Sequence, residues 1–291
     1  MTDSRGLELR AMSEDDLAAG LRLSRACGWN QTLEDWRRLL ALGPGLFRVG
    51  TLDGRVVAAA GAVRYGEALA WICMVLVDPA ERGHGLGTAI FDEVLGGCQA
   101  EVRAGRLRTV GLDATPGGRR IYVQRGFVDG PPLVRLRLEP PVTQAGTPKS
   151  VGPLAEEDVD AVLALDREVF GADRAPLLRW ARGAALELAW IARAERRVTG
   201  YCFGRHGDRS DQVGPVVAED VASAVELVRA CLSAERSRAL VLDARVEPSW
   251  LRELGDLGFR EERPFTRMYL GEAQPTAGPQ MERAVFGPEF G

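Results

Sequence analysis

The chain has 291 residues, of which 46% are hydrophobic and 27% are charged, and its formal net charge at pH 7 is −4. Its length allows two domains of ordinary size, and its composition is normal for a soluble globular protein. The weak acidic excess gives no electrostatic reason to expect nucleic acid or an anionic membrane as a partner.

The first third of the chain has, in order, the patterns of a strand (7–10), two helices (13–23 and 32–40) and three strands (47–52, 56–63 and 69–77). Thr32 and Asp35 form a potential capping pair for the second helix. Asp53-Gly54 between two apolar runs indicates a hairpin turn. We therefore expect an antiparallel start followed by a buried strand.

Residues 75–88 join that buried strand to a glycine-rich turn and to a helix that we expect to begin near Thr88. Gly83, Gly85 and Gly87 leave room for a ligand close to the backbone, and the helix N-terminus favours an anion. Arg82 adds a positive charge. Neither a P-loop nor the dinucleotide fingerprint fits, because no Gly-Lys-Ser/Thr follows and the glycines are evenly spaced by two.

A further strand (107–112), a short helix through Tyr122 and a last strand (134–138) complete the first half. Arg82-x-x-Gly85-x-Gly87 resembles the pyrophosphate-binding motif of the GNAT acyltransferase superfamily. Tyr122-x-x-x-Gly126-Phe127 is similar to another element of that superfamily, and the order of strands and helices matches as well. The resemblance implies a domain that binds an acyl-coenzyme A.

Residues 140–150 are rich in proline and lack an apolar period, so we interpret them as a linker between domains 1–139 and 151–291. The second half repeats landmarks of the first, since Leu112-Asp113-Ala114 recurs as Leu242-Asp243-Ala244 and Gly126-Phe127 as Gly258-Phe259. The whole chain resembles tandem GNAT proteins. We expect an α/β (α+β) fold of two GNAT-like domains, each with a mixed, mostly antiparallel central sheet flanked by helices.

The second domain is expected to be degenerate and to cap the acceptor site or form an interface. Where the first half has its glycine loop, the second has Ala218-Glu219-Asp220, whose carboxylates would repel pyrophosphate. Leu254 stands where the first half has Tyr122. One thioester site, in the first half, follows from these differences.

The resemblance implies transfer of an acyl group, most simply acetyl, from acetyl-CoA to the primary amine of a small molecule or peptide. It assigns coenzyme A binding to ten residues of the strand end and the loop: Val75, Leu76, Val77, Arg82, Gly83, His84, Gly85, Leu86, Gly87 and Thr88. An unpaired strand segment at 75–77 would offer its backbone to the pantetheine amides.

Tyr122 is the expected general acid for the coenzyme thiolate, because a phenol of pKa about 10 stays protonated at neutral pH. The general base is harder to assign. Three carboxylates lie near strand ends that border the expected cleft, Glu67, Asp78 and Asp113, and each of the three could equally be a turn or capping residue. Glu67 is preferred among them. His84 lies within the phosphate loop, and we do not expect it to be the base.

The acceptor is expected to contact Trp29, Asn30, Gln31 and Trp36 from the first half. A polar stretch of the second half that contains Arg205 and His206 could contribute, or could be a solvated hairpin loop. Two other functions remain open at this stage. The donor could be an acyl group on the phosphopantetheine of a carrier protein, or the chain could bind acyl-CoA without catalysis.

The cysteines and the apolar segments limit where the protein is expected to be located and which metal or disulfide sites it can form. Five cysteines without a Cys-x-x-Cys pair predict neither a disulfide framework nor a zinc knuckle, and the two histidines add no ligand set. The apolar run 69–77 is far shorter than the ~20 residues that span a bilayer, and the N-terminus lacks the apolar core of a signal peptide. We therefore expect a cytoplasmic protein without a metal or a membrane partner.

Overall fold

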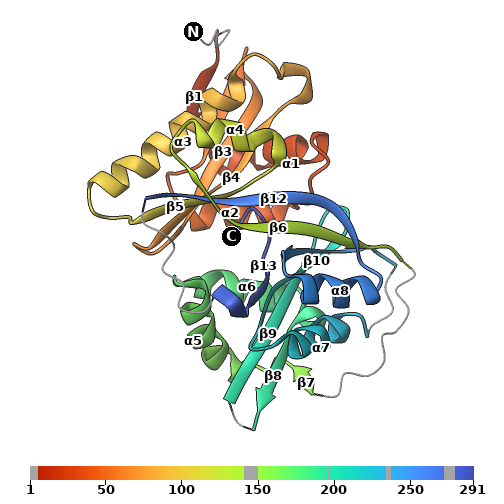
Figure 1. Ribbon diagram of the computed structural model, residues 1–291. Helices are drawn as coiled ribbons and strands as arrows, with labels where there is room; N and C mark the ends of the chain where they lie inside the picture. The colour runs from red at the N-terminus through yellow and green to blue at the C-terminus, as the bar shows by residue number, and fades with distance from the viewer. Residues whose placement is uncertain (1–5, 141–149, 196, 234–236, 272–278) are drawn as a thin grey trace.

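The structure is a computed structural model that describes residues 6–140, 150–195, 197–233, 237–271 and 279–291. Most of the expected linker, residues 141–149, lies outside the described residues. Figure 1 shows two lobes joined by strands that run across the middle of the molecule. Among the described residues, no helix is long and apolar enough to cross a bilayer.

The described residues form one 13-stranded sheet and eight α-helices. The strands are β1 (Glu8–Ala11), β2 (Arg48–Leu52), β3 (Arg55–Tyr65), β4 (Leu69–Val77), β5 (Thr109–Ala114), β6 (Val128–Leu138), β7 (Val151–Pro153), β8 (Trp190–Ala194), β9 (Arg197–His206), β10 (Asp211–Ala218), β11 (Leu240–Arg245), β12 (Arg260–Gly271) and β13 (Glu282–Val285). The helices are α1 (Leu17–Ala26), α2 (Leu33–Leu42), α3 (Leu86–Arg103), α4 (Pro116–Val123), α5 (Val159–Phe170), α6 (Ala175–Ala184), α7 (Val221–Cys231) and α8 (Pro248–Asp256).

The expected elements of the first half are present, with shifted ends. The Thr32 hydroxyl accepts from the backbone N–H of Asp35 at 3.1 Å, and Asp35 accepts from the N–H of Thr32 at 2.7 Å, so the capping pair is confirmed. Strand β6 begins six residues earlier than the apolar pattern indicates. Its first residues, Val128–Pro132, lack a strand-like sequence but pair with β12.

The two halves of the chain exchange strands. β6 of the first half pairs with β11 of the second, while β12 of the second half lies between β5 and β6 (Figure 1). The sheet order is β1-β2-β3-β4-β5-β12-β6-β11-β13-β10-β9-β8-β7. Each half therefore completes the sheet of the other, and the strands of both halves form one continuous sheet.

The repeated aspartates lie at this exchange. Asp113 on β5 accepts two hydrogen bonds from Arg267 on β12, at 2.9 and 2.8 Å. Asp243 on β11 accepts two from Arg135 on β6, both at 2.8 Å. Both carboxylates are buried in the sheet. The recurring Leu-Asp-Ala segment thus marks the position at which each half binds an arginine from the exchanged strand.

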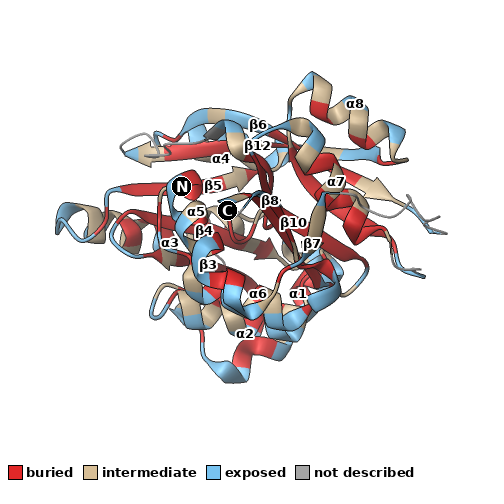
Figure 2. Cartoon of the chain, turned by 90° about the horizontal axis from the view of Figure 1, so that it is seen from below, coloured by how far each residue is buried: buried red, intermediate tan, exposed pale blue. Residues whose placement is uncertain are grey.

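Helices cover both faces of the sheet. One core brings together apolar residues of α1 and α2 with those of α5 and α6, so it is continuous between the halves. On the opposite face, α3 packs in one core with β3, β4 and β5, and α7 and α8 pack in another with β10 and β11. Figure 2 shows the strands largely buried, and exposed residues on the outer side of helices such as α8.

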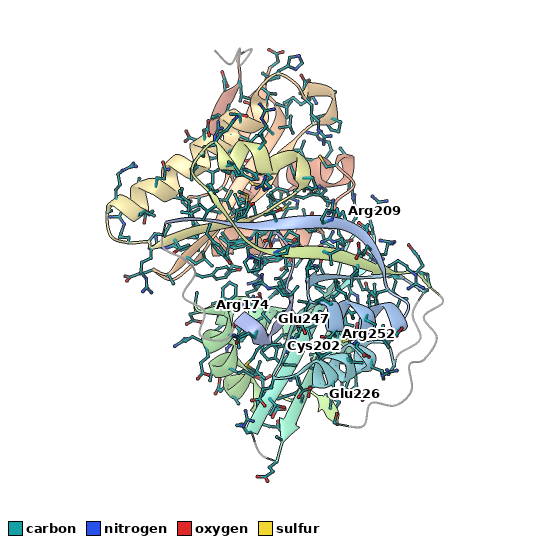
Figure 3. All side chains as sticks on the ribbon, in the orientation of Figure 1. Arg174, Cys202, Arg209, Glu226, Glu247 and Arg252 are labelled. Atoms are coloured by element: carbon teal, nitrogen blue, oxygen red, sulfur yellow. The ribbon has the colours of Figure 1, made fainter. Side chains whose placement is uncertain are left out.

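The last residues of the chain, 286–291, form a buried tail between the halves. Tyr65 donates a hydrogen bond to the Phe290 carbonyl at 2.6 Å, and the Trp71 indole donates to the Pro288 carbonyl at 2.9 Å. From the second half, Arg174 donates to the Gly291 carbonyl at 3.2 Å (Figure 3). Both halves therefore fix the position of the tail, which lies beside the cavity described next.

Candidate active site

The site begins where β4 and β5 separate. These two parallel strands pair only through Leu69–Trp71 and Thr109–Gly111. Met74 has a φ of 55°, in the left-handed region, and the register of β4 against β3 shifts at the same place. Such a bulge turns a strand away from its neighbour. Among the described residues, Val75–Val77 therefore have no partner strand on the β5 side.

The glycine loop follows directly and leads into α3. Gly83 and Gly85 have φ values of 85° and 80°, which glycine adopts without strain. Helix α3 begins at Leu86, two residues before the expected Thr88. In the described part of the chain, the backbone N–H groups of residues 83–88 make no hydrogen bond. A run of free donors at a helix N-terminus binds an anion.

A groove of about 590 Å³ lies between the unpaired end of β4 and the glycine loop. Nine of the ten residues expected to hold coenzyme A line it: Val75, Leu76, Val77, Arg82, Gly83, Gly85, Leu86, Gly87 and Thr88. His84 does not line the groove, and its ring lies 3.3 Å from the Glu81 carbonyl oxygen. A Cβ at Gly87 would lie 3.3 Å from a Val77 methyl group, so glycine keeps the loop close to β4.

Tyr122 lies at the junction of this groove with a second, smaller cavity of about 80 Å³. Its ring packs 4.7 Å from that of Phe91 and 6.2 Å from that of Phe127. Burial raises the pKa of Tyr122 to about 12, so the phenol remains protonated throughout the neutral range. Its ring is therefore fixed, and its proton is available where the two cavities meet.

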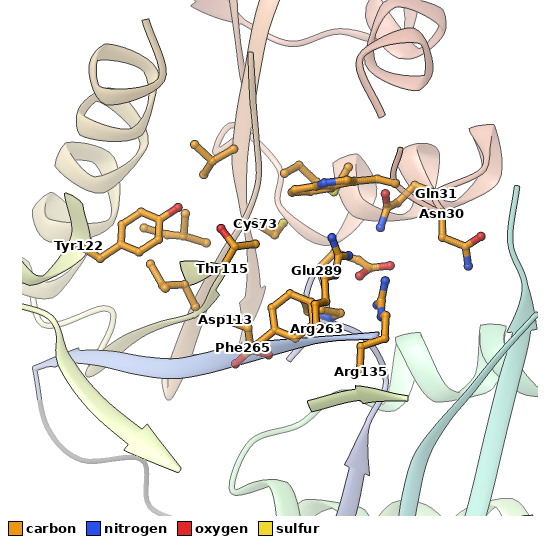
Figure 4. Close-up of a pocket in the computed structure, with 16 residues that line it drawn as sticks. Asn30, Gln31, Cys73, Asp113, Thr115, Tyr122, Arg135, Arg263, Phe265 and Glu289 are labelled. Carbon is orange, nitrogen blue, oxygen red and sulfur yellow. The ribbon is translucent and has the colours of Figure 1, made fainter. Parts of the chain in front are cut away.

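Figure 4 shows the smaller cavity, with Tyr122 on one side and Asn30 and Gln31 on the other. Its charged lining residues come from four separate segments, β5, β6, β12 and the tail: Asp113, Arg135, Arg263 and Glu289. Among the described residues, no group of three or more His, Cys, Asp or Glu side chains is placed to hold a metal ion.

The four expected acceptor residues have different positions. Trp29 lines both cavities, and Asn30 and Gln31 line the smaller one. The Asn30 amide is already bonded to the loop before β10, because it donates to the Ser210 carbonyl at 2.9 Å and accepts from two backbone N–H groups. Trp36 is fully buried and donates to Ser24 at 3.0 Å, so it belongs to the core.

The three candidate bases lie at different places in the structure. Glu67 is exposed in the turn before β4 and lines neither cavity. It stands eight residues from Val75, or roughly 26 Å along an extended chain. Asp78 makes ion pairs with Arg22 and Arg55 at the surface. Asp113 lines the small cavity, but both its oxygens are bonded to Arg267. None of the three has a free carboxylate at the site.

Arg135, Arg263 and Glu289 were not expected from the sequence. Arg135 and Arg267 are separated by 132 residues, the same offset as Gly126 and Gly258, so a comparison of the two halves could have paired them. Glu289 gives no such signal, since only the tail's hydrogen bonds with distant residues bring it to the cavity.

Family models match both halves of the chain. Residues 14–127 match a model described as "Acetyltransferase (GNAT) family", and residues 162–286 match one described as "Acetyltransferase (GNAT) domain". The chain belongs to the GNAT acetyltransferase family. The expectation of a tandem GNAT protein is confirmed, and this GNAT protein is an acetyltransferase with two domains of the family.

Known proteins resemble this tandem GNAT protein over most of its length. The uncharacterized N-acetyltransferase YitH of Bacillus subtilis (strain 168) is 23% identical over 271 residues, which cover 91% of this chain and 93% of that protein. A putative acetyltransferase from Pyrococcus horikoshii has a similar structure, with a TM-score of 0.76, 21% identity and coverage of 98% and 96% of the two chains. A tandem GNAT protein from the clavulanic acid biosynthesis pathway has a TM-score of 0.63, 16% identity and coverage of 91% and 98%. These structures show that the tandem fold is shared.

Proposed function

We propose that this tandem GNAT protein transfers an acetyl group from acetyl-CoA to a primary amine, with the donor bound in the groove of the first half. The observation that carries the proposal is the run of free backbone N–H groups at residues 83–88, which begins α3 and faces the groove. Arg82 adds a full positive charge beside them. Together these groups suit a pyrophosphate.

The unpaired edge of β4 supports the same orientation of the donor. On the side of Val75–Val77 that faces away from β3, the backbone is open to the amides of a pantetheine arm, because β5 has diverged from β4 there. The Val77 carbonyl also accepts a hydrogen bond from Arg82 at 3.4 Å. An arm that extends along this edge from the loop carries its thioester toward Tyr122, where the groove and the small cavity meet. The amine then approaches from the small cavity.

Tyr122 provides the general acid in this scheme. The amine nitrogen attacks the thioester carbonyl, the C–S bond breaks, and the phenol gives its proton to the departing thiolate. The raised pKa keeps Tyr122 protonated until the thiolate forms. A backbone N–H of the unpaired β4 segment stabilises the oxyanion.

The second domain lacks the corresponding donor site, which supports a single site per chain. At the start of α7, the Asp220 carboxylate accepts a hydrogen bond from the Ser223 N–H at 2.7 Å, so the helix N-terminus is already capped by an anion of the chain. Glu219 beside it makes an ion pair with Arg197. At the place of Tyr122, Leu254 is fully buried.

Calorimetric titration with acetyl-CoA tests the proposal. The expected result is one site per chain, abolished by Gly85→Glu, which puts a carboxylate where the pyrophosphate binds. Gly45→Glu is the matched control, because Gly45 has a similar φ of 74°, is exposed and lines neither cavity. Absence of binding to the unmodified protein, or equal effects of the two variants, would refute the site. A donor on a carrier protein would then become the preferred reading.

We also place this reaction in the cytoplasm. All five cysteines are among the described residues and none is in a disulfide, which is typical of proteins in reducing compartments.

A further inference from the structure

Glu289 places a carboxylate with one free oxygen in the wall of the small cavity. Its side chain is buried, and Oε1 accepts a hydrogen bond from Arg205. Among the described residues, no hydrogen bond reaches Oε2. The tail that carries Glu289 is held at Pro288 and Phe290 by Trp71 and Tyr65. A buried carboxylate with an unused oxygen can accept a proton or bind a cation.

Glu289 shares its hydrogen-bonding arginine with a second carboxylate, and the guanidinium groups of Arg135 and Arg263 also act on it electrostatically. Arg205 is the shared partner of Glu289 and of Asp35, whose carboxylate lies 2.7 Å from it. One guanidinium thus faces two carboxylates. Burial raises the pKa of Asp35, and the carboxylate of Glu289 adds to this effect. A bound ammonium group would pair with the unused oxygen of Glu289.

Gln31 provides a second unused polar group on the same side. Its side chain is 5% exposed, lines the cavity, and has a buried amide oxygen without a hydrogen-bond partner among the described residues. A buried amide oxygen without a partner is destabilising, so such groups are normally satisfied by a ligand or by water. A donor on the ligand would satisfy it.

Two arginines on the β6 and β12 side of the cavity have unused hydrogen-bond donors. Arg263 makes no ion pair or hydrogen bond with the described residues, and its guanidinium lies 5.0 Å from the centre of the Phe265 ring. Arg135 lies 5.6 Å from the same ring and uses only Nε and Nη2 for Asp243, which leaves Nη1 free. Burial and the nearby Arg135 guanidinium lower the pKa of Arg263. Two neighbouring guanidinium groups of this kind would bind an anion.

Resting on the proposed function, we infer that the acceptor is a small amino acid, with its ammonium group at Glu289 and Gln31 and its carboxylate at Arg263 and Nη1 of Arg135. Figure 4 shows Arg263 and Arg135 beside Glu289, so the two charged groups of one small ligand can reach them together. The cavity of about 80 Å³ is much smaller than the groove of about 590 Å³, which favours a small acceptor.

Glu289 acts as the general base in this arrangement. The ammonium N–H bond breaks as Glu289 takes the proton, and the neutral amine forms the C–N bond with the thioester carbon. The C–S bond breaks and the thiolate takes a proton from Tyr122. The second proton that the nitrogen loses restores the phenol, and the first passes from Glu289 to water, so the products are the N-acetyl amino acid, coenzyme A and one proton.

The test compares amino acids with their decarboxylated amines, using acetyl-CoA and the full chain. Glycine, alanine and serine are assayed against methylamine, ethylamine and ethanolamine, with ethanolamine phosphate as a phosphate-bearing acceptor. We expect at least one amino acid to be acetylated with kcat/KM at least ~100-fold above its amine, from charged hydrogen bonds to the carboxylate. Preference for the plain amines or for ethanolamine phosphate would overturn the inference.

Arg263→Met gives the sharper result, because Arg263 has no ion pair to lose and the change should not unfold the protein. We expect kcat/KM for the amino acid to fall by about 10- to 100-fold, mainly through KM, with little change for the amine. Arg252→Met is the matched control, since Arg252 is exposed on α8, away from the cavity (Figure 3). Equal losses for amine and amino acid would overturn the assignment.

Glu289→Gln tests the base. We expect kcat to fall by ~10²- to 10⁴-fold and to recover at high pH, where the free amine predominates. Acetyl-CoA affinity and the thermal unfolding midpoint report whether the variant remains folded. A folded variant with unchanged kcat refutes the role.

Different results would refute acetyl-CoA binding and the amino-acid acceptor. Loss of acetyl-CoA binding in the unmodified protein would refute the proposed function. A protein that binds acetyl-CoA but acetylates none of the amino acids would overturn only the inference about the acceptor.

Discussion

Arg267 on β12 is the position at which the exchange of strands can be tested most directly. Its guanidinium donates to both oxygens of Asp113 on β5, at 2.9 and 2.8 Å, and both side chains are fully buried. Arg267→Met keeps an apolar side chain over Trp71, whose ring centre lies 4.5 Å from the guanidinium carbon. The change therefore removes the partner of a buried carboxylate while preserving much of the packing.

The expected cost follows from that burial. Removal of one partner of a buried ion pair costs about 3–5 kcal/mol, because the remaining charge is left without compensation. With a urea m-value of about 3 kcal/mol/M, the unfolding midpoint should fall by roughly 1 to 1.7 M. The double variant Asp113→Leu with Arg267→Met should recover most of this loss, since apolar pairs replace buried ion pairs at little cost.

Urea unfolding of the single and double variants measures both quantities. Arg179→Met is the control, because the Arg179–Asp160 pair has the same separation of 2.8 Å but its side chains are 51% and 90% exposed. Its removal should cost less than about 1 kcal/mol. If Arg267→Met costs no more than Arg179→Met, the reasoning about the exchanged strands is wrong.

Three further predictions concern the site and the domains. Tyr122→Phe should lower kcat by ~10²- to 10⁴-fold and leave the Kd of acetyl-CoA nearly unchanged, and loss of binding alone would contradict the role of the phenol. Burial raises the pKa of Tyr122 to about 12 and also raises the pKa values of Tyr65, Tyr201 and Tyr269, so the protonated form of every tyrosine extends to higher pH than usual. The folded protein should therefore show no phenolate absorbance with a midpoint near pH 10, and one such transition would refute the burial of these rings. Residues 1–139 alone should fail to fold or to bind acetyl-CoA, because β5 and β6 lose β12, and native affinity in that fragment would disprove the dependence.

The expected division into two domains does not describe how the sheet is built. The sequence predicts domains at 1–139 and 151–291, but β6 pairs with β11 and β12 pairs with β5, so each of these strands lies beside a strand of the other half. Apolar periodicity cannot show this exchange, because it reports which face of a strand is buried and not which strand lies beside it. The repeated aspartates were recognised in the sequence, but their arginine partners were not.

The residues expected to contact the acceptor show the same limit of sequence analysis. A polar-aromatic segment indicated Trp29, Asn30 and Gln31 because of its composition, and all three line the small cavity. Trp36 followed the same reasoning but is buried in the core, since its helical position faces inward. Glu67 was chosen for its place next to a strand, and the structure puts it at the opposite end of that strand from the cavity.

The sequence by itself determined the glycine loop at which we propose that the donor binds. Strand, glycine loop and helix start are consecutive in the chain, and local conformation is enough to direct the N–H groups of residues 83–88 into one groove. Only the tertiary structure decided the acceptor side. Its charged wall depends on Arg135, which binds Asp243 from 108 residues away, and on the tail of Glu289, held by Tyr65 across 225 residues. Such contacts form only when the whole chain has folded, and no local pattern records them.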